Sequence, residues 1–139
     1  MSVKRMPEAG LHFERALQLN PNEGNAKVLY GIWHCFSGRV DQAVACIEDA
    51  LEHDPFGHEW YWDDYCIVLV AAGRYEEAIA AYDKIMAPAP WSYAFVAIAK
   101  FILGDTKGAK NVLARYKAES QVSADDRAAV TVEMATNRP

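Results

Sequence analysis

Apolar residues recur three and four positions apart along most of the chain, as in Ala43, Ile47, Ala50 and Leu51. This spacing places them on one face of an amphipathic helix. No stretch alternates apolar and polar residues over the length that a strand needs. The pattern therefore predicts an all-α protein, with helices near 7–19, 24–37, 40–53, 59–72, 75–86, 90–103, 106–119 and 124–136.

The same landmarks return at a nearly constant interval. Four residues recur 34 positions later: Ala9, Phe13, Ala16 and Pro21 return as Ala43, Ile47, Ala50 and Pro55. The segment 38–43 matches 73–78 at a shift of 35, and 104–109 follows at a shift of 31. A period of this length is typical of an array of helix pairs, in which each pair is one structural repeat.

The period and its landmarks resemble the tetratricopeptide repeat. The matching positions are the turn glycines, the alanines that follow them and the prolines between units: Gly38, Gly73, Gly104, Ala43, Ala78, Ala109, Pro21, Pro55 and Pro90, with GRYEEAIAAYDKI as the best-matching segment. The resemblance covers about residues 8–119. It implies one domain over 1–139, a right-handed superhelical solenoid of antiparallel helix pairs: a half repeat at 7–21, repeats at 24–55, 59–88 and 90–119, and a capping helix at 123–136.

The capping helix is expected from a local signal. Ser123 offers a hydroxyl cap and Asp125 and Asp126 stand in the first turn that would follow it.

In such an array the first helices of the pairs line a concave wall. By resemblance, fifteen positions should face inward: Asn25, Val28, Ile32, Cys35, Phe36, Trp60, Asp63, Ile67, Val70, Ala71, Trp91, Ala94, Ile98, Phe101 and Ile102. We expect nine of them to form a peptide-binding groove: Val28, Ile32, Phe36, Trp60, Asp63, Ile67, Trp91, Ile98 and Phe101.

The chemistry of this wall limits its partners. A terminal carboxylate needs cationic or amide donors, whereas this wall offers only Asn25 and the repelling Asp63. An apolar wall suits the apolar face of a helix or an extended hydrophobic segment, with Trp60 and Trp91 as anchors. The alternative is that the groove is narrow, or filled by the last helix, and that these residues are core.

Composition excludes several classes. The net charge is −5, from 14 basic and 19 acidic residues, which disfavours nucleic-acid binding. The longest apolar stretches fall short of the ~20 residues that span a bilayer, and Glu8, His12 and Glu14 interrupt any export signal. Three widely spaced cysteines suit reduced thiols, so we expect a cytoplasmic protein.

No constellation indicates catalysis or a cofactor. Neighbours on a helix diverge by about 100°, so neither Asp63 with Asp64 nor His34 with Cys35 forms a catalytic pair. His53 and His58 lack the four-ligand spacing of a zinc site. We expect no catalytic residue, metal or cofactor.

These observations predict a non-enzymatic scaffold for protein–protein interaction. The alternative starts from the incomplete first repeat, which leaves Leu11, Phe13 and Leu17 without a covering helix. Two copies would then pair through this face, or a preceding domain would cover it. The segments 60–85 and 87–110 resemble repeat tails of some bacterial nucleotide cyclases and transcriptional regulators, which implies a regulatory C-terminal module of a larger bacterial signalling protein.

Overall fold

The computed structural model describes residues 6–55 and 57–136, and the side chains of 7–55 and 57–121. Within these ranges the chain forms helices and no strand, which confirms the all-α expectation. The helices are α1 (Met6–Leu19), α2 (Gly24–Phe36), α3 (Val40–His53), α4 (Trp60–Ala71), α5 (Tyr75–Tyr82), α6 (Pro90–Ile102) and α7 (Thr106–Thr136).

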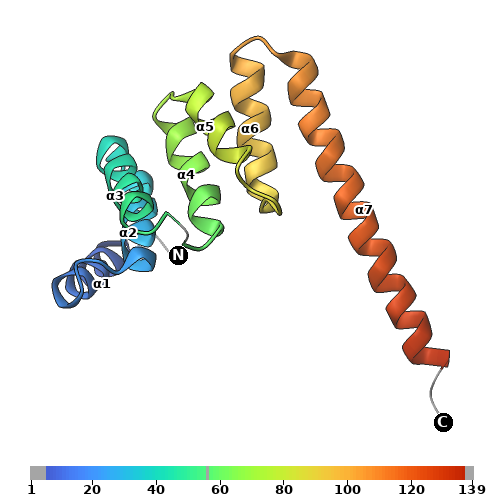
Figure 1. Ribbon diagram of the computed structural model, residues 1–139, viewed down its shortest axis with the longest axis horizontal. Coiled ribbons are helices and arrows are strands. Elements are labelled where there is room, and N and C mark those ends of the chain that lie inside the picture. Colours follow the sequence, from blue (N-terminus) through green and yellow to red (C-terminus); the bar gives the residue numbers. More distant parts are fainter. Residues whose placement is uncertain (1–5, 56, 137–139) are drawn as a thin grey trace.

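The helices follow one another along an arch, with α1 at one end and α7 at the other (Figure 1). They form three pairs, α2 with α3, α4 with α5 and α6 with α7, and α1 packs on α2 as the half repeat. The backbones of the first helices also lie close to each other, α2 to α4 and α4 to α6, whereas in the described part of the chain the backbones of α3, α5 and α7 do not. The closely spaced first helices are therefore the inner layer of a helical-repeat solenoid.

The turn inside each pair is the same motif three times. Gly38, Gly73 and Gly104 have φ angles of +82°, +74° and +87°, which glycine adopts without a Cβ penalty. The next residue's backbone N–H donates to the carbonyl five residues earlier: Arg39 to His34, Arg74 to Leu69 and Asp105 to Lys100. This is the Schellman ending of a helix, and it sends the chain back along its own pair.

Two apolar clusters make up the core, and each joins one pair to the first helix of the next. The first cluster joins α2 and α3 to α4 and holds Val28, Ala43, Val44, Ile47, Ala50, Tyr61 and Val68. The second joins α4 and α5 to α6 and α7 and includes Cys66, Leu69, Ala78, Tyr82, Tyr93, Val96 and Ala97. Stacking of neighbours, rather than any pair alone, buries these residues.

The expected capping helix is wrong as a separate element. Residues 106–119 and 124–136 belong to one helix, α7, which is 31 residues long. No glycine or proline stands between Ala109 and Thr136, so nothing in the sequence breaks the helix at Ser123. The far part of α7 runs away from the arch instead of folding back on it (Figure 1).

Candidate interaction surface

Large apolar side chains are exposed along one face of α6. Trp91, Ile98 and Phe101 lie seven and three residues apart, so they share one face of this helix. Their side chains are 46%, 48% and 64% exposed. Phe36, at the end of α2, and Ile102 are also exposed. These residues are accessible to a partner.

Three predicted groove residues are only half exposed. Ile32 and Trp60 pack against the first core cluster, and Ile67 on α4 is also partly buried. The Trp60 indole contacts the Tyr61 ring edge-on, with centroids 4.7 Å apart. The α4 portion of the predicted groove therefore serves in part as packing.

Val28 and Asp63 were expected in the groove and lie in the core instead, so this part of the prediction is wrong. Val28 has no exposed surface and Asp63 is 4% exposed. They stand at equivalent positions of successive repeats, and in each case the next first helix covers them. The third equivalent, Ala94, is exposed, and none of the described helices covers it as α4 covers Val28 and α6 covers Asp63.

Asp63 has a structural role at the entry to α6. Its Oδ1 accepts hydrogen bonds from the Ala89 backbone N–H at 2.9 Å and from the Ser92 hydroxyl at 2.5 Å. Glu59 similarly accepts a hydrogen bond from the backbone N–H of Met86. The two carboxylates of α4 and its N-cap hold the loop that leads into α6.

A hollow of about 430 Å³ opens between α6 and α7. Seven of its eight lining residues carry no charge, and Lys110 is the exception. The lining residues are Ala94, Ala97, Ile98, Phe101, Thr106, Ala109, Lys110 and Leu113. Sequence reasoning named only part of this surface, although the shift of 31 would have found Leu113, which matches Tyr82.

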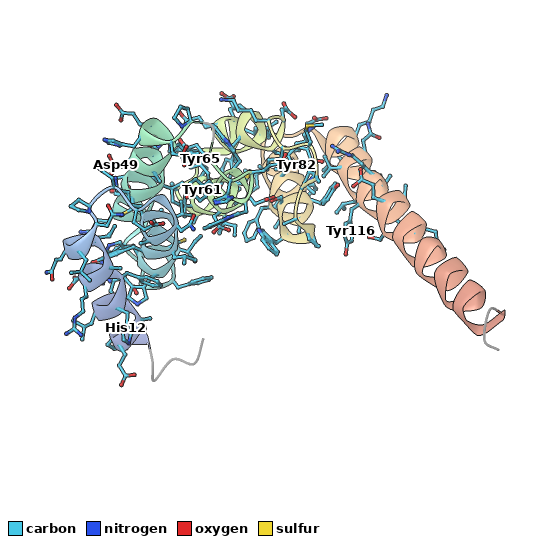
Figure 2. All side chains as sticks on the ribbon, turned by 60° about the horizontal axis from the view of Figure 1, so that its bottom comes forward. His12, Asp49, Tyr61, Tyr65, Tyr82 and Tyr116 are labelled. Carbon is cyan, nitrogen blue, oxygen red and sulfur yellow. The ribbon has the colours of Figure 1, made fainter. Side chains whose placement is uncertain are left out.

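Hydrogen bonds among four aromatic and charged side chains hold the first part of α7 beside the hollow. Glu119 accepts hydrogen bonds from the Tyr93 hydroxyl and, at 3.0 Å, from Arg115 Nε. Arg115 also donates to the Tyr82 hydroxyl, at 3.1 Å. Burial and the neighbouring Glu119 carboxylate raise the pKa of Tyr93 to about 12. Figure 2 shows Tyr82 near the start of α7 and Tyr116 further along that helix.

The three cysteine thiols and the His34 imidazole are half buried or buried, and their pKa values shift toward the neutral forms. Burial raises the pKa of the Cys35 and Cys46 thiols, and that of Cys66 to about 12, which keeps them protonated. Burial and the nearby Arg39 lower the pKa of His34. Among the described residues no group of three metal-ligating side chains comes together.

The outer face of α1 is a second exposed surface. Leu11 and Leu19 are 66% and 84% exposed. Phe13 and Leu17 are half buried instead. The Phe13 ring packs on the Tyr30 ring, with the ring centroids 6.2 Å apart. The face is therefore narrower than the sequence indicated. No helix in the described part of the chain is long and apolar enough to cross a membrane.

Comparison with known proteins supports the fold. No protein-family model matches the sequence, and no curated protein matches it. Among solved structures, the chain is similar to MamA MSR-1 C2, with a TM-score of 0.70 and 16% identity over 85% of this chain and 69% of that one. It is also similar to MamA AMB-1 P212121, with a TM-score of 0.65 and 16% identity over 81% of this chain and 62% of that one. MamA contains tetratricopeptide repeats, so the fold is tetratricopeptide-like.

Proposed function

Starting from a tetratricopeptide-like array with an open apolar inner wall, we propose that this protein is a non-enzymatic scaffold for protein–protein interaction. Its ligand would be the apolar face of a helix or an extended hydrophobic segment of a partner. The observation that carries the proposal is the exposed row of Trp91, Ile98 and Phe101 along α6. Large apolar side chains in a row on one surface of a folded domain are typical of a binding site.

The wall supplies apolar contact but little polar recognition. Of its expected inward positions, Asn25 alone carries an exposed polar side chain. Asp63 is buried and accepts hydrogen bonds from Ala89 and Ser92. A partner would therefore be chosen by the spacing of its apolar side chains. Aromatic anchors such as Trp91 contribute most to binding at surfaces of this kind.

The test uses 16-residue peptides selected from a displayed random library on the intact protein, with affinity measured by fluorescence anisotropy. Trp91→Ala and Phe101→Ala should each weaken binding of a selected peptide by about 2 kcal/mol, and Trp60→Ala by less because it is half buried. Leu19→Ala is the matched control, since it removes an exposed leucine from α1. Selected peptides without apolar residues, or affinities that both α6 variants leave unchanged, would contradict the proposal.

A second candidate rests on the exposed Leu11 and Leu19 of α1. In this alternative the protein is a homodimerisation or regulatory module in the C-terminal part of a larger bacterial signalling protein. Leu11→Glu with Leu19→Glu should then convert a dimer to a monomer in sedimentation velocity, or weaken binding of a preceding domain. A sedimentation coefficient that these changes do not alter would count against it.

We further propose a cytoplasmic setting. All three cysteines are free thiols, which suits a reducing compartment. Fractionation of cells that express the protein would test this, and recovery outside the cytoplasm would contradict it.

A further inference from the structure

The hollow between α6 and α7 is the place where another helix would continue the array. Its lining residues Ala94, Ala97, Ala109 and Leu113 match Asp63, Cys66, Ala78 and Tyr82 of the preceding repeat, which α6 covers and buries. The equivalent residues one repeat earlier are Val28, Gly31, Ala43 and Ile47, which lie buried beside the first cluster under α4. Twice in this chain, therefore, the same surface receives one helix. At the third position Leu113 is 48% exposed.

The second half of α7 extends beyond the arch (Figure 1). Glu119 accepts hydrogen bonds from the Tyr93 hydroxyl on α6 and from Arg115 one turn earlier on α7, which ties this point of α7 to the arch. Beyond it the helix continues for 17 residues, away from the other described helices (Figure 1). Most helical stability in proteins comes from packing of a helix face, so a packing partner would stabilise this half.

The two halves of α7 carry opposite charge. Residues 106–118 hold four basic residues and no acidic one: Lys107, Lys110, Arg115 and Lys117. Residues 119–136 hold four acidic residues and one basic one: Glu119, Asp125, Asp126, Glu133 and Arg127. Among the described residues Lys107, Lys110 and Lys117 take part in no ion pair. The basic half, which borders the hollow, is opposite in charge to the acidic half and would attract it.

From this juxtaposition we propose that two copies of the protein pair through α7, the second half of each helix lying in the α6–α7 hollow of the other. The chain cannot fill its own hollow without a turn, and α7 is continuous through residues 119–123. A second copy fills it without one. The contact is reciprocal, as a twofold dimer requires. Because Ile98 and Phe101 line the hollow, this inference rests on the proposed function and names a second copy of the chain as the apolar partner.

The orientation and register agree with this arrangement. A first helix that follows α7 in the array would run antiparallel to it, and two α7 helices related by a twofold axis across their length are also antiparallel. Centring the pair between residues 119 and 120 brings residues 126–133 of one copy opposite 106–113 of the other. Glu133 then lies level with Thr106, one residue from Lys107, and Asp125 lies level with Ala114, one residue from Arg115.

The first test is the mass of the full chain by sedimentation equilibrium over a wide concentration range. The wild type should be a dimer, and Leu113→Asp should raise the dimer dissociation constant about tenfold or more, because a carboxylate would be buried in the apolar hollow. Leu29→Asp is the matched control: Leu29 is 44% exposed on α2, and the dimer should persist. Circular dichroism and the thermal midpoint of each variant show that it folds.

A charge exchange then tests the pairing itself. Lys107→Glu should weaken the dimer, and adding Glu133→Lys in the same chain should restore it, since opposite charges again lie next to each other in this register. A wild type that stays monomeric, as expected if α7 bends onto its own hollow, overturns the proposal. So does a dimer that Leu113→Asp leaves intact, that only Leu11→Glu dissociates, or that the exchange does not restore.

Discussion

Oδ1 of Asp63 lies 2.5 Å from the Ser92 hydroxyl oxygen and 2.9 Å from the Ala89 backbone nitrogen. Ser92 has no exposed surface and Asp63 very little. One carboxylate of the second repeat thus satisfies the hydroxyl and a backbone N–H at the start of the third. The repeat-to-repeat junction is polar at this end and apolar elsewhere, which fixes where α6 begins relative to α4.

Replacing Asp63 should destabilise the protein strongly. Asp63→Ala leaves the Ala89 N–H and the Ser92 hydroxyl without their acceptor inside the core, and we expect a loss of about 2–3 kcal/mol in the free energy of unfolding. Asp63→Asn keeps an oxygen at this position and should cost less. Urea unfolding followed by circular dichroism measures both. Equal losses for the alanine and asparagine variants would show that the hydrogen bonds do not set the stability of this junction.

The contribution of Asp64, the next residue, to the free energy of unfolding should fall as the pH rises, which is the opposite of what most carboxylates do. Burial, and then the neighbouring Asp63, raise the pKa of Asp64 to about 6. The folded state therefore binds a proton more readily than the unfolded state, and its stability falls as pH rises from about 4 to about 6. Asp64→Asn removes this loss and should be more stable than the wild type at pH 7 by roughly 1 kcal/mol or more.

The gain should disappear below about pH 4, where the Asp64 carboxyl is neutral in both states. Urea unfolding of the two proteins at pH 4 and pH 7 gives the comparison. Asp41→Asn serves as control because Asp41 is an exposed acid in the first turn of α3. A pH-independent difference between the Asp64 variant and the wild type would refute the assignment.

The stability that the Lys27–Asp49 ion pair contributes should fall as the pH falls, as is usual for a paired carboxylate. Lys27 Nζ lies 2.6 Å from Asp49 Oδ2, and the lysine side chain is nearly buried while the aspartate is half exposed. The hydrogen bond from Lys27 lowers the pKa of Asp49. The pair contributes stability above the unfolded pKa near 3.8 and loses it as pH falls through the lower folded value.

Asp49→Asn should accordingly cost about 1 kcal/mol at pH 7, a figure reduced for the solvent around Asp49. The cost should shrink at the lowest pH at which the protein stays folded. Thermal unfolding at several pH values measures it, and a cost that grows on acidification would exclude the ion pair as its source.

The sequence predicted the repeat because the residues that define it act locally. Gly38, Gly73 and Gly104 adopt left-handed backbone angles that few other residues tolerate, so their spacing reveals the helix pairs directly. The inward positions of α6 were predicted from resemblance to the repeat family, and periodicity explains why Trp91, Ile98 and Phe101 share one face. Helix periodicity decides which residues share a face.

The wrong predictions concern what covers that face. Val28 and Asp63 have the same helix positions as Ala94, and only the presence of a following helix makes them core. Likewise Ser123 and the acids after it make a good helix start, but they are also compatible with a helix interior when no glycine or proline intervenes. Such outcomes depend on neighbours in space, which the local pattern does not contain.

The close approach of α2 and α3 gives a final prediction. A Cβ atom on Gly31 would lie 2.8 Å from Ile47 Cγ1 and 3.0 Å from the Ala43 carbonyl oxygen, and the latter belongs to the backbone and cannot turn aside. Gly31→Ala should therefore destabilise the protein by about 1–3 kcal/mol, although alanine in a helix interior normally gains about 1 kcal/mol over glycine. Gly38→Ala is a control in which the loss of stability has another cause. Its added Cβ meets no atom, and the loss comes from backbone strain at a φ angle of +82°. If urea unfolding found Gly31→Ala as stable as the wild type, α2 and α3 would have to lie further apart than these 2.8 Å and 3.0 Å distances require.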